Sequence, residues 1–170
     1  MKSLFKKTIA VGAMVLFGLS LSYGQSYEKG DNLLNLGVGF GGSLGMPMGI
    51  SFEHGFSDKI SGGIYVGYAS KEENFGVASA KWTYILGAAR ASYHFNFNVE
   101  GLDPYLGVIL GYNYAKSELT GNMAGWSADA GGLVYGGHAG ARYFFSQKFG
   151  VFAEVGYGLG NLNAGLTFKL

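Results

Sequence analysis

The sequence predicts an all-β protein: an eight-stranded, antiparallel, up-and-down transmembrane β-barrel preceded by a cleavable signal peptide. Three observations predict this fold. Apolar residues alternate with polar residues and glycine along most of the chain, charged residues make up only 14% of it, and aromatic residues make up 16%. An alternation with a period of two is typical of strands. Few charges and many aromatic residues suit a barrel whose outer surface faces lipid.

The alternation is clearest in the last stretch, residues 149–170. Every second residue over 149–157 is apolar, and the pattern resumes over 162–170 after a short turn. Glu154 and Lys169 both fall on the opposite, polar face. A strand pair with one apolar face and one polar, glycine-containing face is typical of a transmembrane barrel hairpin.

The first 24 residues predict a secretory signal peptide. Residues 1–7 contain three lysines, residues 8–20 form an apolar run, and small residues precede a cleavage site before Gln25. The alternative, a lone transmembrane helix, requires a run of roughly 20 apolar residues. We therefore expect a signal peptide at 1–24 and one outer-membrane β-barrel domain at 25–170.

The composition of the mature chain limits its function. It has no cysteine, which excludes disulfides and thiol chemistry. Without the three lysines of the signal peptide, 9 basic residues face 11 acidic ones. A balance of about −2 argues against nucleic acid as a partner.

Eight alternating segments follow the signal peptide, and their connections differ in length. The segments are about 32–42, 47–56, 59–69, 81–97, 103–115, 132–146, 149–157 and 162–170. Outer-membrane barrels combine short periplasmic turns with longer external loops. With both termini in the periplasm, we expect external loops at 70–80 and 116–131. Trp126, in the second loop, is a candidate contact with a surface partner or with lipid headgroups.

The fully charged residues inside the predicted strands all face the barrel interior. They are Glu53, Arg90, Arg142, Glu154 and Lys169. A charge on the lipid face would cost about 2–4 kcal/mol at mid-bilayer. We predict an ionic cluster in the periplasmic half of the lumen, in which Glu53 and Glu154 clamp Arg90 and Arg142. His94 and His138 lie nearby. The alternative is a lumen that conducts protons or small solutes.

Two residue pairs could in principle support acyl-transfer chemistry on lipid A: Ser92 with His94, and Glu53 with His54. A nucleophile also needs a third group that orients its base, and an inward Ser92 has no path to a lipid chain. We therefore predict no enzyme and no catalytic residues. The three histidines lie on separate strands without a ligand at metal-binding spacing, and the glycine-rich stretches lack a P-loop lysine. We expect no metal and no cofactor.

Three stretches of the sequence carry a family resemblance: GGHAGARYFFSQKFGVFAEVGYGLG, LDPYLGVILGYNY and ARASYHFNF. They resemble the small Gram-negative outer-membrane β-barrel ("porin family") proteins, such as the OmpX-like barrels and the OmpA membrane domain. The resemblance covers essentially the whole mature chain. The chain departs from the pattern in ending on Leu170, where many such barrels end in phenylalanine.

The resemblance implies a place in the bacterial outer membrane, among outer-membrane lipids and lipopolysaccharide, after assembly by the barrel-insertion machinery. The expected function is non-enzymatic: a structural role in envelope integrity, with a lumen filled by side chains. One alternative is a narrow porin-like channel for small solutes. Another is surface adhesion or binding through loops 70–80 and 116–131, and lipid A modification comes last.

Overall fold

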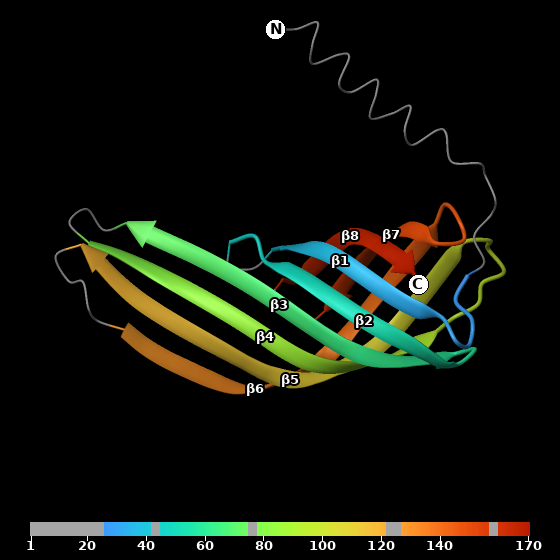
Figure 1. Cartoon of the computed structure of the whole chain (residues 1–170), viewed down its shortest axis with the longest axis horizontal. Helices are drawn as coiled ribbons and strands as arrows, with labels where there is room; N and C mark the ends of the chain where they lie inside the picture. Colours follow the sequence, from blue (N-terminus) through green and yellow to red (C-terminus); the bar gives the residue numbers. More distant parts are fainter. Residues whose placement is uncertain (1–25, 42–44, 75–77, 122–126, 157–159) are drawn as a thin grey trace, which may run out of the picture.

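The computed structural model describes residues 26–41, 45–74, 78–121, 127–156 and 160–170. These residues form eight strands that pair in sequence order into one closed antiparallel barrel (Figure 1). The strands are β1 (Asn32–Phe40), β2 (Met48–Ser57), β3 (Ile60–Asn74), β4 (Ala78–His94), β5 (Leu102–Gly121), β6 (Ser127–Phe144), β7 (Phe149–Gly156) and β8 (Leu162–Lys169). The predicted barrel is confirmed. The predicted signal peptide lies outside the described residues. Within them, no helix has the length and apolar character needed to cross a membrane.

The alternation of the sequence becomes the two faces of the barrel wall. On β4, Arg90, Ser92 and His94 are buried in the interior, whereas Ile85 and Tyr93 on the other parity are more than 40% exposed. Successive side chains of a strand point to opposite faces of the sheet, so each strand contributes one inner and one outer row.

The pairing register determines how strongly the strands tilt. The register partners can be followed from Val38 on β1, strand by strand, around the barrel. In one direction, through β2 to β5, they lead to Gly131 on β6; in the other, through β8 and β7, they lead to Ala141 on the same strand. These two residues are ten positions apart, so the barrel has a shear number of ten. Eight strands with this shear tilt by about 40° from the barrel axis and enclose an interior that side chains can fill.

The strands differ greatly in length, and this corrects one expectation. Strands β3 to β6 have 15, 17, 20 and 18 residues, whereas β1, β2, β7 and β8 have 8 to 10. Figure 1 shows the four long strands extending together at the end opposite the C-terminus. At about 2.5 Å of height per tilted residue, they rise roughly 20 Å above the short strands. We call this projecting part the tall sheet, and the end with the C-terminus the lower end.

The loops expected at 70–80 and 116–131 are therefore wrong in large part, because the tall sheet contains most of both ranges. The alternation weakens there: residues 127–133 of β6 are exposed on both faces, so neither face of this segment must be apolar. Residues of opposite charge are register partners on neighbouring strands of the tall sheet: Glu72 is opposite Lys81, which is opposite Glu118.

The interior has two layers. The lower layer is ionic and is described below. The upper layer, beneath the tall sheet, is apolar: Ala69, Leu86, Ala88 and Ile109 are buried and pack with Tyr65, Tyr84 and Val134.

Candidate functional site: the ionic network of the lumen

Glu53, on β2, lies at the centre of the lower layer and is fully buried. Its Oε1 contacts Nη2 of Arg142 and lies 3.3 Å from Nε of Arg90. Its Oε2 accepts hydrogen bonds of 2.8 Å from the hydroxyls of Ser61 and Ser92. Two cations and two hydroxyls thus surround one carboxylate. These ion pairs and hydrogen bonds offset the free energy that burying the charge costs.

Arg142, on β6, is fully buried as well, and all three of its donor nitrogens have partners. Besides the bond to Glu53, Nη1 donates to Oδ2 of Asp103 at 3.0 Å, and Nε donates to Oδ1 of Asn35 at 3.2 Å. The guanidinium carbon lies 4.2 Å from the centre of the Tyr105 ring, a cation–π distance. Arg142 therefore connects β6 to three other strands, β1, β2 and β5, through one side chain.

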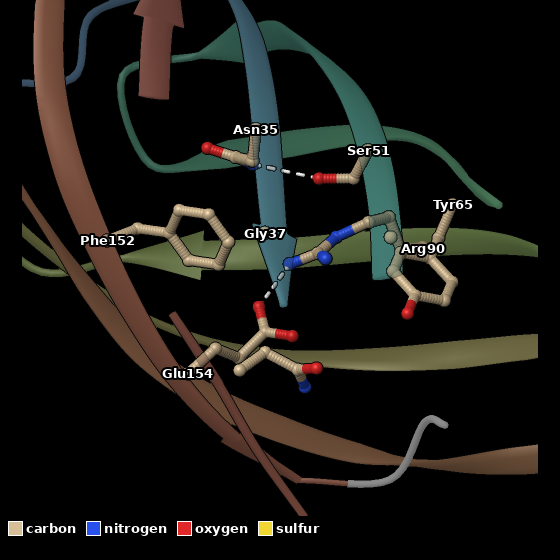
Figure 2. A pocket seen from close by; sticks show the side chains of 9 residues that line it. Asn35, Gly37, Ser51, Tyr65, Arg90, Phe152 and Glu154 are labelled. Atoms are coloured by element: carbon tan, nitrogen blue, oxygen red, sulfur yellow. Dashed lines mark hydrogen bonds and ion pairs between the residues drawn. The ribbon is translucent and has the colours of Figure 1, made fainter. Parts of the chain in front are cut away.

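Arg90, on β4, joins the centre of the network to its upper side (Figure 2). Its Nη2 donates to Oε2 of Glu154 at 2.7 Å, and the same oxygen accepts a 2.9 Å bond from the Tyr105 hydroxyl. A cavity of about 20 Å³ lies beside Arg90 and Glu154, with Asn35, Ser51 and Asn163 in its lining. This volume suits a single water molecule.

His138 accepts a hydrogen bond from Arg90, and this determines its tautomer. Arg90 Nη2 and His138 Nε2 are 3.0 Å apart, and arginine can only donate. Nε2 therefore carries no proton, and the imidazole is neutral with its proton on Nδ1. Ser92 Oγ lies 3.1 Å from the same nitrogen.

His94 takes part in a serine–histidine–aspartate arrangement. Its Nδ1 is 2.6 Å from Oδ1 of Asp103, and its Nε2 is 2.8 Å from Oγ of Ser61. However, the Ser61 hydroxyl donates to Glu53 and the side chain is fully buried. Nucleophilic catalysis requires the serine proton to point at the histidine and a substrate to reach the oxygen. Neither condition is met, so the arrangement is a structural one.

The segment before β1 covers the lower end of the network. The Tyr27 ring stacks on His94 with ring centres 3.6 Å apart, and its hydroxyl lies 2.7 Å from the carbonyl oxygens of both Ser57 and Ile60, between which its one proton is shared. Lys169 holds the same segment through Asp31 at 2.8 Å and the carbonyl of Ser26 at 2.9 Å. Burial, and the carboxylates of Asp103 and Asp31, raise the pKa of Tyr27 to about 12.

The structure brings together the six residues that the sequence analysis placed in the lumen, and Glu53 contacts both arginines. Glu154 pairs with Arg90, whereas the contacts of Arg142 go to Glu53 and Asp103. The reason is the register: Arg142 is opposite Phe152, and Glu154 is opposite Gly140, one inward position higher. Trp126 lies outside the described residues.

Sequence reasoning missed five members of the network: Tyr27, Asn35, Ser61, Asp103 and Tyr105. Asp103 and Tyr105 share the inward parity of β5, so the alternation could have identified them. Tyr27 precedes the alternating pattern, and no local signal places it in the barrel mouth.

The structure resembles solved transmembrane barrels. The N-terminal β-barrel domain of Pseudomonas aeruginosa OprF superposes with a TM-score of 0.57 at 19% identity, covering 85% of this chain and all of that domain. A de novo designed transmembrane β-barrel gives 0.57 at 15% identity, covering 85% and 98%. Neisserial surface protein A gives 0.49 at 19% identity, covering 82% and 91%. No protein-family model and no curated protein matches the sequence.

The first two likenesses agree with the closed eight-stranded barrel of this chain. The fold is thus that of the small transmembrane β-barrels found in bacterial outer membranes. At these identities the likeness concerns the fold, and the role of this chain has to be argued from its own residues.

Proposed function

We propose that the chain is a non-enzymatic protein of the bacterial outer membrane, where its sealed barrel contributes to the structure and integrity of the envelope. Its outer surface supports this placement, because exposed apolar side chains cover it along every strand. In this role its partners are outer-membrane lipids, lipopolysaccharide and, during assembly, the barrel-insertion machinery. Nucleic acid is not among them.

One observation carries the proposal: side chains rather than open space fill the lower lumen. Glu53, Arg90 and Arg142 are each at most 7% exposed, and their contacts cross the barrel from wall to wall. Tyr27 covers this network from below. A cavity of about 20 Å³ in the upper part of the network leaves no room for a hydrated ion.

Planar-bilayer recording of the purified protein tests the sealed lumen. We expect no steady conductance from the wild-type protein. Arg142→Ala, which removes the central cation, should produce brief openings, whereas Lys71→Ala, at an exposed ion pair, should not. Steady, ion-selective openings from the wild type would refute the seal and favour a narrow channel for small solutes.

An envelope role makes a cellular prediction as well. Deletion of the gene should increase the sensitivity of the cells to detergents and bile salts. Expression of the Arg142→Ala variant in the deletion strain should restore resistance only in proportion to the amount of folded variant. Unchanged resistance in the deletion strain would contradict the structural role. Mass spectrometry of lipid A should find no difference in acylation, because the buried Ser61 has no access to substrate.

Surface binding is a second candidate function, and the tall sheet is the observation that favours it. Four strands rise together above the rest of the barrel. If the termini are periplasmic, this sheet projects from the cell surface. The binding surface would then be this sheet, in place of the two loops expected from the sequence.

A further inference from the structure

Residues 26–31, the segment before β1, cross the lower end of the barrel, and we call this segment the strap. Its backbone is bonded to β2: the Gly30 amide donates to the Gly55 carbonyl at 2.9 Å, and the Gly55 amide donates to the Asp31 carbonyl at 2.8 Å. Tyr27 is the buried side chain of the strap, at 7% exposure. Tyr27 therefore joins the strap to the lumen.

The ring of Tyr27 lies on the imidazole of His94, which ends β4. The ring centres are 3.6 Å apart and the two planes differ by 8°. Two neutral aromatic rings disfavour this face-to-face arrangement and prefer offset or edge contacts. A cation over the face of a tyrosine ring, in contrast, is attracted by the ring. The stacking geometry therefore favours a charged imidazole.

The hydrogen bonds of Ser61 place a proton on Nε2 of His94. The one hydroxyl proton of Ser61 is donated to Oε2 of Glu53 at 2.8 Å. The same hydroxyl oxygen lies 2.8 Å from Nε2 of His94, so in this contact the oxygen can only accept. Nε2 must then be the donor and carry a proton.

The contact with Asp103 places a second proton on the same ring. Nδ1 of His94 and Oδ1 of Asp103 are 2.6 Å apart, which requires a proton between them. The other oxygen of Asp103 accepts from Nη1 of Arg142 at 3.0 Å, and this cation keeps Asp103 a carboxylate. The proton therefore belongs to Nδ1, and with both nitrogens protonated the ring is an imidazolium.

The charge balance of the buried network agrees with this assignment. Its other charged side chains are Glu53, Asp103, Glu154, Arg90 and Arg142. Three carboxylates and two guanidiniums leave one negative charge, which the imidazolium of His94 neutralises. An unbalanced charge in a buried site is costly. His138 differs, because its Nε2 accepts from Arg90 and the ring is neutral.

We propose that His94 is a buried imidazolium whose charge holds Tyr27, and with it the strap, over the lower end of the barrel. Loss of the proton would leave one nitrogen bare. A bare Nδ1 would face the Asp103 carboxylate, which has no proton to donate, and a bare Nε2 would draw the Ser61 proton away from Glu53. Tyr27 would lose its cation in either case. The strap is thus a lid that responds to pH, independently of the envelope role and of conduction.

Water has a route to His94 from the lower end. A cavity of about 370 Å³ lies against Tyr27, His94 and Asp103 and extends to the exposed Asp58 and Lys59. Hydroxide can remove the proton through this cavity. The titratable and charged groups around His94 are Tyr27, Glu28 and Lys29 on the strap, Asp58 and Lys59 on the β2–β3 turn, Asp103 and Tyr105 on β5, and, one contact further, Glu53 and Arg142.

Nitrogen NMR of the full-length mature barrel, labelled with ¹⁵N-histidine in phosphatidylcholine nanodiscs at pH 7, tests the charge without any substitution. We expect one histidine with two protonated nitrogens, and the loss of its signals in His94→Gln assigns it. His138, assigned in the same way with His138→Gln, should show one bare nitrogen. A bare nitrogen at His94 would overturn the proposal.

Electron paramagnetic resonance of a spin label on the strap tests what the charge does. The chain has no cysteine, so Glu28→Cys at an exposed position gives a single labelling site. We expect an immobile label, whose ratio of mobile to immobile population rises about tenfold in His94→Gln and stays unchanged in His138→Gln. Gel mobility before and after heating verifies folding. The same label mobility in the two variants would overturn the proposal.

The pH response is measured on the protein without either histidine substitution. Between about pH 7 and 10, Tyr27 stays neutral because its pKa is about 12. Label mobility should follow the His94 signals at every pH, rising where the ring loses a proton and staying constant where it does not. A rise in mobility at constant His94 signals, or loss of the proton without a rise, would overturn the proposal.

Discussion

Replacing Arg142 by methionine removes the charge at the centre of the lumen while keeping a long side chain. In the native barrel this guanidinium contacts Glu53, donates to Asp103 and Asn35, and lies over the Tyr105 ring. After the substitution, Glu53 keeps Arg90 at 3.3 Å and two serine hydroxyls. Asp103 keeps its contact with Nδ1 of His94.

The size of the effect follows from burial. Both members of the Arg142–Glu53 pair have side chains that are 0% exposed, so solvent cannot replace the lost partner. Removal of one member of such a pair costs about 3–5 kcal/mol. Because Glu53 retains other partners, we expect a loss of about 3 kcal/mol, roughly a hundredfold or more in the folding equilibrium.

The measurement is reversible urea unfolding in lipid vesicles, followed by the difference in gel mobility between folded and unfolded barrel. The matched control is Lys71→Met, which breaks the exposed Lys71–Glu73 pair and should cost well under about 1 kcal/mol. The double variant Glu53→Gln/Arg142→Met completes the cycle and should recover part of the loss. If Arg142→Met lowered stability no more than the control, the ionic network would not hold the barrel together.

Three further predictions test other parts of the structure. Because the pKa of Tyr27 is about 12 when folded and about 10 when unfolded, its contribution is complete below pH 10 and disappears as the pH rises to 12. The stability difference between wild type and Tyr27→Phe should therefore shrink over that range, and a constant difference would contradict the burial of its hydroxyl. Ile64→Lys, on the outer face at 60% exposure, should cost about 2–4 kcal/mol in vesicles, and a neutral result would mean that this face does not meet lipid. Gly63→Ala should prevent folding because its Cβ would overlap the Phe52 carbonyl oxygen, whereas Gly87→Ala has open space and should fold normally; equal gel shifts for the two would refute the packing of β2 on β3.

The alternation along each strand could be interpreted without the structure because it is a local property. Whether a side chain points inward depends only on its parity within the strand. This is why Glu53, Arg90 and Arg142 could be assigned to the interior, and why the eight strands could be located. Charges inside and apolar residues outside follow from the same parity.

The partners of those charges depend on information that no single strand contains. Arg142 and Glu53 are 89 residues apart and meet because the register shifts at each strand pair add up to a shear of ten. The same register shifts place Glu154 beside Arg90. Parity within a strand shows only that both side chains point inward, and does not determine which of them meet. Tyr27 enters the network through a turn before β1, where no periodic pattern exists.

The sequence by itself therefore determined the number of strands, their faces and the inward position of the charges, because these follow from a period of two. Only the tertiary structure decided which charged side chains pair, how Tyr27 covers the lower end of the lumen and how far each strand extends. Above the barrel both faces are solvated, so the apolar pattern that reveals a strand elsewhere is no longer required. The tall sheet comes from that part of the chain, where pairing between strands, rather than burial of an apolar face, holds the structure together.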